Sequence, residues 1–423
     1  MNILWITNII LPPIAKSLNF NVPVTGGWMY SSALELIKDE RINLCVATVY
    51  NGNKLIDGTI NNIKYFLIPL KGKSNTKYLK ELEEYWKTIY IDFKPDLTHI
   101  HGSEFAHGLA YINSCGNKNV VVSIQGLVSV HYRYYLAGIS IKNILKNTTF
   151  KDIFKGNILS EQKKYYIRGM IEQEIIRKVS NVIGRTSWDK AHTFAINPNV
   201  NYFFCNETLR NVFYNNIWDY QKCEKHSIFI SQAGYPIKGL HCVILALPLV
   251  LRNYPDTKIY IGGNNIIKED TIKDKLKYSG YAKYLNKIIA KSGIKDRVIF
   301  TGSLDEEKMC SRYLKTNVFI CPSSIENSPN SLGEAQLLGV PCIASYVGGS
   351  PEMMKGNEDY LYRFEEIEML AMLIQKVFRE VKKPNLEMRK IALSRHNPDL
   401  NNKQLINIYE TIISGSCIDF NVK

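Results

Sequence analysis

The chain has 423 residues, 45% of them hydrophobic and 22% charged, and its formal net charge is +14. This length and composition predict a globular protein of two or three domains. Its longest apolar runs fall well short of the roughly 18 residues that a membrane span needs, so we expect no transmembrane helix. Nine scattered cysteines without a Cys-x-x-Cys pair are typical of a reducing cytoplasm and argue against a disulfide framework or a metal knuckle.

A charge of this size requires an anionic partner or a tolerance for one. The lysines are dispersed rather than gathered in a basic arm, and the sequence contains no nucleic-acid-binding signature. We therefore expect no nucleic acid partner.

The first predicted strand, Ile3–Thr7, leads into a loop that ends at a helical run over Met29–Ile37. The stretch from Met1 lacks the basic n-region of a signal peptide, so we interpret it as a buried strand. Gly26 and Gly27 lie in the loop, where the missing Cβ atoms would let the backbone approach a ligand. A flexible surface loop is the alternative interpretation.

Strand-like runs alternate with helical or polar segments through the first half of the chain. They lie at Leu44–Val49, Ile63–Ile68, Leu97–His101, Val120–Ile124 and Asn181–Gly184. Such alternation is typical of an α/β domain with a mostly parallel sheet. His101 and Gln125 each close a strand and precede a glycine, so we expect both at the same edge of a cleft. A structural role is the alternative for each.

Leu127–Lys178 is the most basic long segment, with ten Lys or Arg residues against four acids. Its cations are interleaved with tyrosines and phenylalanines, a mixture that suits a helix lying on an anionic interface. We hypothesise that this segment meets the bilayer or a lipid-linked molecule. A solvated charged face on helices packed by Ile and Leu is the alternative.

Arg185 is predicted to lie where a strand meets the start of a helix, near the end of the first domain. This position makes it a candidate for contacting a phosphate or another ligand oxygen. A structural ion pair with Asp189 is the alternative.

A second α/β series begins after the polar stretch Tyr220–Lys225, with a strand predicted over Ser227–Ser231. Lys238 and Gly239 follow that strand, ahead of a helical run over Leu240–Leu251. Further strands are predicted over Lys258–Gly263 and Val298–Gly302, and the last amphipathic run covers Lys403–Ile413.

The stretch from Asn317 to Ser345 reads as strand, polar loop, helix and strand, with strands at Val318–Ile320 and Val340–Ala344 around a helix at Leu332–Leu338. In such units ligands lie beyond the carboxyl end of the strand, where the loop turns into the helix. The sequence therefore predicts a ligand site at the start of this helix.

Asn330 or Ser331 is the expected N-cap of that helix, which leaves the backbone N–H groups of Ser331, Leu332 and Gly333 free for an anion such as phosphate. Glu326 and Glu334 flank the anion site. The alternative is an acid that complements the helix dipole together with a solvated helix glutamate.

This stretch resembles the Glu-x7-Glu signature of the retaining glycosyltransferases of family 4, which are group 1 glycosyltransferases. Gly348-Gly349-Ser350-Pro351-Glu352 resembles the Gly-Gly-x-Pro-Glu that follows the signature. The resemblance is strong over residues 227 to 360 and mainly architectural over 1 to 220. It implies the α/β GT-B fold, with two Rossmann-like domains facing across a cleft and a C-terminal helix that crosses back to the N-terminal domain.

The domain boundaries that we expect follow from this fold. Residues 1–222 would form the N-terminal acceptor-side domain, residues 223–398 the nucleotide-sugar-binding domain, and residues 399–423 the helix and tail that return to the N-terminal domain.

The resemblance also implies roles for the site residues. Lys238 would bind the donor diphosphate as a point charge, Glu326 would orient the sugar hydroxyls, and Glu334 would accept from the ribose hydroxyls. Glu326 and Lys238 are the predicted catalytic residues. The other predicted nucleotide-sugar-binding residues are Gly26, Gly27, Ser303, Leu304, Asn330, Ser331 and Leu332, and the acceptor-side candidates are His101, Gln125 and Arg185.

Two positions depart from the family pattern. Gln125 stands where the family commonly has a histidine, and an amide cannot exchange a proton near neutral pH, which leaves His101 as the alternative base. Ala233 stands where the family usually has an arginine, five residues before Lys238, so one cation of the expected pair is missing.

The predicted reaction is transfer of a hexosyl group, with retention, from a nucleotide-diphosphate-sugar to a glycan or lipid-linked acceptor in surface polysaccharide synthesis. The sequence contains no Asp-x-Asp, so we expect neither a metal nor another cofactor. We expect a cytoplasmic protein, with peripheral contact to the anionic inner face of the membrane as a further hypothesis. A solubilising role for the charge is the alternative.

Two other functions remain open at this point. A degenerate GT-B protein would bind nucleotide sugar without turnover, as Ala233 and Gln125 suggest. A GT-B nucleotide-sugar 2-epimerase would share the architecture and need no acceptor.

Overall fold

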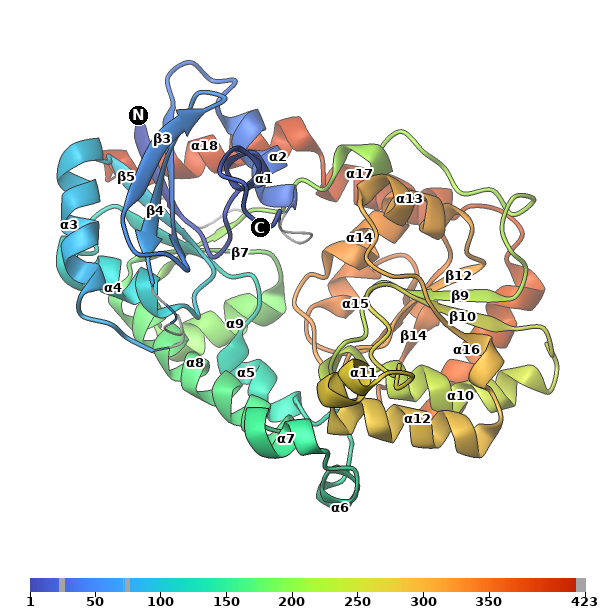
Figure 1. Ribbon diagram of the computed structural model, residues 1–423. Helices are drawn as coiled ribbons and strands as arrows, with labels where there is room; N and C mark the ends of the chain where they lie inside the picture. The colour runs from blue at the N-terminus through green and yellow to red at the C-terminus, as the bar shows by residue number, and fades with distance from the viewer. Residues whose placement is uncertain (23–26, 71, 73–76, 416–423) are drawn as a thin grey trace. The chain divides into compact units, whose positions relative to one another are not determined.

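The computed structural model describes residues 1–22, 27–70, 72 and 77–415, apart from the side chains of residues 272, 273 and 275. The chain divides into two compact units (Figure 1). Unit 1 comprises Met1–Ser129, Tyr166–Leu209 and His396–Lys423, and unit 2 comprises Val130–Tyr165 and Arg210–Arg395.

This division differs from the expected boundaries at 222 and 398. The segment 130–165 groups with unit 2, because helix α6 (Ile141–Lys146) packs against α12 (Gly280–Ser292) and α7 (Phe150–Lys155) packs against α11 (Ile272–Lys277). Unit 2 resumes at Arg210, ahead of the predicted position. The sequence contains no signal for such packing between distant helices.

Unit 1 is built on a sheet whose described strands follow the order β3-β4-β2-β1-β5-β6-β7-β8. β3 pairs with β4 in antiparallel fashion, and the other pairings are parallel. The strands are β1 (Asn2–Ile6), β2 (Asn43–Tyr50), β3 (Ile56–Ile60), β4 (Ile63–Pro69), β5 (Leu97–His101), β6 (Val120–Ser123), β7 (Asn181–Gly184) and β8 (Asn201–Phe204). The helices are α1 (Pro12–Ser17), α2 (Gly27–Leu36), α3 (Leu82–Phe93), α4 (Ala106–Cys115), α9 (Ser187–Ile196) and α18 (Pro398–Ser414).

Unit 2 is built on a second, wholly parallel sheet of described strands, in the order β11-β10-β9-β12-β13-β14. Its strands are β9 (Ser227–Ile230), β10 (Lys258–Ile261), β11 (Val298–Phe300), β12 (Val318–Cys321), β13 (Cys342–Ser345) and β14 (Leu361–Tyr362). In addition to α6, α7, α11 and α12, its helices are α10 (Leu240–Leu251), α13 (Glu306–Leu314), α14 (Asn330–Leu337), α15 (Ser350–Met353), α16 (Ile367–Glu380) and α17 (Leu386–Arg395). Helices α5 (Val128–His131) and α8 (Ile158–Lys178) contain the boundaries between the units.

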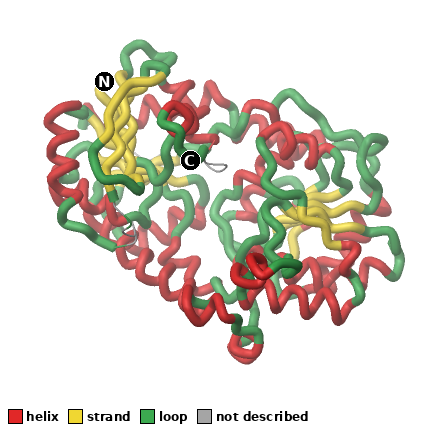
Figure 2. The backbone as a smooth tube through the Cα atoms, in the orientation of Figure 1, coloured by secondary structure: helices red, strands yellow, loops and turns green. Residues whose placement is uncertain are grey.

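Helices cover both faces of each sheet, so the central strands are buried on both sides and read as continuous apolar runs. Figure 1 shows α10 and α12 on one face of the unit 2 sheet and α13 and α14 on the other. Figure 2 shows the strands of each unit gathered in its centre with helices around them. The predicted α/β class with mainly parallel sheets is confirmed.

The C-terminal helix α18 belongs to unit 1, where it packs against α2 and β5. Tyr409 is its central anchor and is fully buried. The Tyr409 hydroxyl accepts a hydrogen bond from Trp5 Nε1 at 2.9 Å and shares another with His99 Nδ1 at 2.6 Å. The last helix, which the amphipathic run at Lys403–Ile413 predicted, therefore completes the core around the first strand, as the resemblance to the GT-B enzymes implied.

None of the helices in the part of the chain that the structure describes combines the length and the apolar character that crossing a bilayer requires.

Replacing Tyr409 by phenylalanine should destabilise unit 1, because Trp5 Nε1 and His99 Nδ1 would both stay buried without this partner. Each unsatisfied group costs about 1–3 kcal/mol, so we expect the melting temperature of unit 1 to fall by about 5 °C or more in calorimetry. Tyr90→Phe, at a tyrosine that is 41% exposed, is the matched control. Equal melting temperatures for the two variants would contradict the role given to Tyr409.

Candidate functional site

An ion pair between Lys238 and Glu326 lies at the carboxyl ends of two neighbouring strands of unit 2. Lys238 closes the short 3₁₀ turn Pro236–Lys238 after β9, and Glu326 lies in the loop after β12. The Lys238 Nζ atom lies 2.5 Å from Glu326 Oε1, and their side chains are only 21% and 11% exposed. Ser323 Oγ donates a second hydrogen bond to the same oxygen at 2.7 Å.

Two glycines fix the backbone around this pair. Gly239 has φ +72°, and a Cβ atom there would lie 1.7 Å from the carbonyl oxygen of Pro322. Gly348 has φ +51°, and a Cβ atom there would lie 1.8 Å from the carbonyl oxygen of Glu326. Gly349 N–H donates to that same oxygen at 3.1 Å. The glycines are therefore required by close backbone approach as well as by left-handed backbone geometry.

The electrostatics of the pair keep both groups charged. Burial alone would raise the pKa of Glu326, but the Lys238 ammonium and the Ser323 hydroxyl outweigh it and lower the pKa below its ordinary value. Burial alone would lower the pKa of Lys238, but the charge of Glu326 outweighs it and raises the pKa. The site thus holds a fixed cation and a fixed anion in contact at neutral pH.

Glu334 lies on α14 and faces a different cation. Arg210 Nε donates to Glu334 Oε1 at 2.8 Å, and Nη2 lies 2.7 Å from the same oxygen. Burial raises the pKa of Glu334 to about 7, although the Arg210 charge opposes the rise. Glu334 is therefore the carboxylate of the site whose protonation changes near neutral pH.

The start of α14 differs from the predicted capping arrangement. The N-cap is Pro329, without a side-chain cap hydrogen bond, so the expectation of an Asn330 or Ser331 cap is wrong. The N–H groups of Leu332 and Gly333 donate to the carbonyl oxygen of Pro329 at 3.0 and 3.2 Å. These two N–H groups were predicted to be free, and the tight proline turn uses them instead.

A small cavity of about 30 Å³ joins several of the predicted residues. Lys238, Glu326, Ser323 and Ser331 line it, together with Gln232. Asn330 and Ser331 are half-buried at the start of α14, and Leu332 is buried. The structure therefore brings Lys238, Glu326 and Ser331 together around one space.

The predicted nucleotide-base loop lies after β11. Ser303 is exposed and Leu304 is half-buried, directly before the helix cap Asp305 of α13. Glu306 in the first turn of α13 is close enough for its charge to raise the pKa of Glu334 further. The loop thus approaches the Glu334 end of the site.

The acceptor-side candidates belong to unit 1. His101 ends β5 and is 5% exposed, with its ring stacked on His99 at a centroid distance of 3.8 Å. Burial, aided by the charge of Arg185, lowers the pKa of His101 to about 3, so its ring is neutral. Both His101 ring nitrogens and Gln125 Nε2 are buried without a hydrogen-bond partner among the described residues.

Arg185 is 7% exposed and links neighbouring segments within unit 1. Its Nη1 atom lies 2.7 Å from Glu207 Oε1, and Nη2 donates to the carbonyl oxygen of Ile124 at 2.5 Å. Asp189, which we considered as its ion-pair partner, accepts from its backbone N–H at 3.0 Å.

The predicted glycine pair lies at the start of α2. Gly27 is the first residue of α2, and Gly26 lies outside the described residues.

Three residues of the site went unassigned in the sequence analysis. Ser323 and Arg210 contact the two glutamates, and His131 lies close enough to Glu326 for its charge to lower the pKa of that carboxyl group. Ser323 lies three residues before Glu326, a local signal that could have been used. Arg210 and His131 lie far away in the sequence and gave no such signal.

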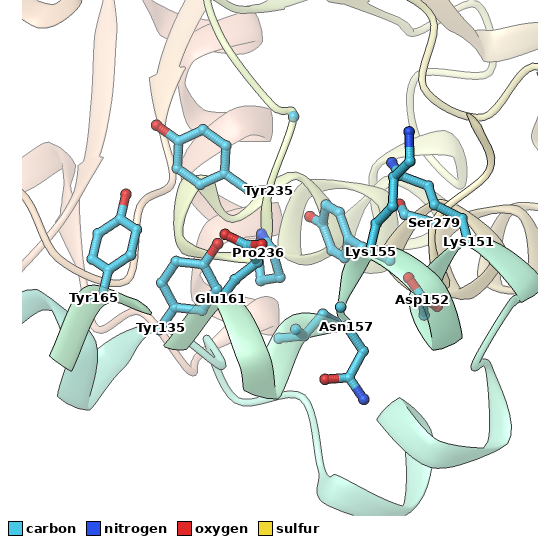
Figure 3. A pocket seen from close by; sticks show the side chains of 14 residues that line it. Tyr135, Lys151, Asp152, Lys155, Asn157, Glu161, Tyr165, Tyr235, Pro236 and Ser279 are labelled. Atoms are coloured by element: carbon cyan, nitrogen blue, oxygen red, sulfur yellow. The ribbon is translucent and has the colours of Figure 1, made fainter. Parts of the chain in front are cut away.

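A larger cavity, of about 430 Å³, lies in unit 2 on the loop that leads to Lys238 (Figure 3). Gly234, Tyr235 and Pro236 of that loop line it, together with residues of α7, α8 and α12. Its polar lining includes Tyr135, Tyr165, Tyr235, Tyr281, Lys151 and Lys155. Figure 3 shows Tyr135, Tyr165 and Tyr235 on one side of the view and the two lysines on the other.

Comparison with solved structures identifies the fold to which this architecture belongs. The chain resembles sucrose-phosphate synthase from Thermosynechococcus elongatus, with a TM-score of 0.71 and 17% identity over 98% of this chain and 100% of the other. It also resembles Anabaena HepE in complex with UDP and glucose, with a TM-score of 0.64 and 14% identity over 97% and 100% of the two chains. The chain has the GT-B fold.

Sequence comparison matches only part of the chain. Residues 216–392 match the family model described as glycosyl transferases group 1. An uncharacterized glycosyltransferase of Methanocaldococcus jannaschii is 24% identical over 196 residues, which cover 45% of this chain and 46% of the relative. A GDP-mannose-dependent phosphatidylinositol monomannoside mannosyltransferase of Mycolicibacterium smegmatis is 28% identical over 124 residues, 28% and 29% of the two chains. The aligned regions span less than half the length of these curated relatives.

Gly348→Ala should destabilise unit 2 more than an alanine placed at an uncrowded left-handed glycine. Its Cβ atom would meet the carbonyl oxygen of Glu326, whereas Gly293 has φ +65° and open space at the position that a Cβ atom would take. Gly293→Ala should cost about 1 kcal/mol, and Gly348→Ala a further 1–3 kcal/mol or so for the clash. Thermal melting of both variants measures the difference, and equal losses would mean that the approach to Glu326 tolerates a methyl group.

Proposed function

We propose that the protein is a retaining hexosyltransferase that moves a sugar from a nucleotide-diphosphate-sugar to a hydroxyl of a glycan or lipid-linked acceptor. The observation that carries this proposal is the buried Lys238–Glu326 pair at the carboxyl ends of β9 and β12. It lies inside the segment that matches the group 1 glycosyltransferases. A role in surface polysaccharide synthesis and membership of glycosyltransferase family 4 belong to the same proposal.

The charges of the pair suit the chemistry of glycosyl transfer. The reaction releases a diphosphate and passes through a sugar that resembles an oxocarbenium ion, so a preorganised cation stabilises the leaving group. Lys238 supplies that cation next to the space that Ser331 also lines. Glu326 accepts hydrogen bonds from Lys238 and Ser323 at Oε1. A sugar hydroxyl can donate to Oε2, the second oxygen of the carboxylate.

Retention at the anomeric carbon follows from a front-face transfer in this proposal. The departing phosphate oxygen takes the proton of the acceptor hydroxyl while the new glycosidic bond forms on the same face. Glu326 is held by Lys238 and Ser323, which favours an orienting role over nucleophilic attack. Trapping of a covalent sugar–enzyme adduct would contradict this step.

Glu334 and Arg210 form the nucleotide end of the proposed donor site. The Glu334 carboxylate would accept hydrogen bonds from the ribose hydroxyls, with Arg210 holding it in place. The loop at Ser303 and Leu304 would meet the base. HepE is described with UDP and glucose and the mycobacterial relative as GDP-mannose-dependent, so these proteins support a nucleotide-sugar donor and leave its base open.

His101 and Gln125 are the proposed acceptor-side contacts of unit 1. Their buried nitrogens lack partners among the described residues, and a neutral imidazole and an amide are good hydrogen-bonding groups for a hydroxyl. The low pKa of His101 and the amide of Gln125 both argue against a general base here, which agrees with proton transfer to the departing phosphate.

The alternative without turnover is a nucleotide-sugar-binding protein. It is favoured by Ala233, which is 2% exposed and supplies no second cation to the phosphate site. Incubation with donor and candidate acceptors distinguishes a transferase, which forms a glycosylated product, from a protein that only binds the donor. Incubation with donor alone tests the epimerase, which needs no acceptor.

We also propose that the transfer reaction needs no metal.

Lys238→Ala should weaken donor binding and lower transfer by about 10² to 10³-fold, because the developing charge on the diphosphate would lose its cation. Binding is measured by thermal shift against UDP-, GDP-, ADP- and TDP-sugars with and without EDTA, and transfer by product release. Lys291→Ala, at an exposed lysine of α12, is the control. Unchanged activity of Lys238→Ala would mean that the phosphate site lies elsewhere, and a shift lost with EDTA would contradict metal independence.

Donor affinity should depend on the ionisation of Glu334. Its pKa is raised to about 7, so the carboxyl group is mostly protonated at pH 6 and mostly ionised at pH 8. If only the carboxylate binds ribose, affinity for an intact nucleotide-sugar should be about tenfold weaker at pH 6 than at pH 8. Glu334→Gln should be weak at both pH values, and a pH profile shared by the variant and the natural protein would assign the titration to another group.

A further inference from the structure

The helices α6 and α7 of unit 2 expose an unusual set of large apolar side chains. Five of them are 58–71% exposed: Ile141, Leu145, Phe150, Ile153 and Phe154. Single exposed apolar residues are ordinary, but five of them on two short helices that follow each other in the chain mark an interaction surface. We call this group the α6–α7 tip.

Capping and packing contacts hold the α6–α7 tip in place, and its apolar side chains face solvent. Thr149 and Asp152 form a capping box at the start of α7, and Ser140 caps α6 by accepting from Asn143 N–H. Ile144 of α6 is 3% exposed, on the side that packs against α12. Thr149 Oγ1 also donates to the carbonyl oxygen of Tyr278 at 2.8 Å.

Helix α7 has two faces of opposite chemistry. Phe150, Ile153 and Phe154 share the exposed face, and the rings of Phe150 and Phe154 lie 4.6 Å apart between centroids. Lys151, Asp152 and Lys155 lie on the other face and line the 430 Å³ cavity (Figure 3). The exposed phenylalanines therefore do not belong to the cavity wall.

Lysines also lie on α6 and on the helix that it packs against. Lys142 and Lys146 come from α6, and Lys283 and Lys287 come from α12. The charge of Lys146, followed by burial and the charge of Lys283, lowers the pKa of Lys287, so the Lys287 ammonium group is repelled by the other two. Within the described part of the chain, none of these four lysines forms an ion pair with a carboxylate.

The combination of exposed apolar side chains and lysines favours one kind of binding partner for the α6–α7 tip. A two-fold interface between copies of this chain would bring the same lysines face to face, which adds repulsion. A bilayer with anionic headgroups can bind the apolar side chains and the lysines at the same time. The apolar side chains enter the boundary of the acyl region, and the lysines contact phosphates at the surface.

We propose that the α6–α7 tip docks the protein onto an anionic lipid bilayer. The five apolar side chains enter the interface, and the lysines of α6 and α12 contact the headgroups. The cavity behind α7 then lies next to the lipid surface. This docking goes beyond the proposed transfer reaction and does not depend on it.

Flotation of the full chain with vesicles tests the proposal. We expect binding to vesicles of phosphatidylcholine with about 30% phosphatidylglycerol, weaker binding to pure phosphatidylcholine, and loss of the difference in high salt. The variant Ile153→Ser/Phe154→Ser should reduce binding at least tenfold, and Lys142→Glu/Lys146→Glu should remove the preference for anionic lipid. Leu386→Ser, at a 60% exposed leucine of α17, is the control and should bind like the natural protein.

The proposal is overturned if the natural protein stays off anionic vesicles at low salt, or if Ile153→Ser/Phe154→Ser binds them equally well. Sedimentation velocity identifies the other occupant, because a dimer that this double variant dissociates would make the tip a contact between copies of the chain. Melting temperatures like that of the control show that the variants fold, since the replaced side chains are already exposed.

Discussion

The proposed site depends on one buried ion pair, between Lys238 and Glu326. Removing two charges from water is costly, and the cost is recovered here only because the partners touch and Ser323 adds a further hydrogen bond. The carbonyl oxygens of Pro322 and Glu326 approach Gly239 and Gly348 so closely that no side chain fits at either glycine. The backbone of three separate loops is thus arranged around one pair of opposite charges.

Much of this arrangement could be predicted from the sequence. The central strands of both sheets are apolar runs between polar segments, and each run that predicted a strand contains one. Three strands escaped prediction because that signal is weak or short in them: β3 contains Asp57 and Gly58 and is partly exposed, β8 has four residues with both ends exposed, and β14 has only two residues. The positions of Lys238 and Glu326 followed from strand ends, because parallel strands share an edge.

What could not be predicted depends on contacts between distant segments. Arg210 contacts Glu334 from 124 residues away, and the charge of His131 lowers the pKa of Glu326 from a segment that we expected in the N-terminal domain. The grouping of 130–165 with unit 2 rests on how α6 and α7 pack on α12 and α11, which no periodicity reveals. The prediction of the α14 cap was wrong for a local reason, because Pro329 supplies a carbonyl oxygen where we expected a side-chain cap.

The attachment of α18 to unit 1 has a consequence for the order of folding. Trp5 and Tyr409 are separated by 404 residues along the chain, yet they share a hydrogen bond in one core. At a synthesis rate of about 5–20 residues per second, the first strand waits roughly 20–80 s on the ribosome before its partner helix exists. Most of unit 2, from Arg210 to Arg395, is complete before that moment. The C-terminal sheet can therefore form while the N-terminal core is still open, so the end of the chain that is made first is the last to close.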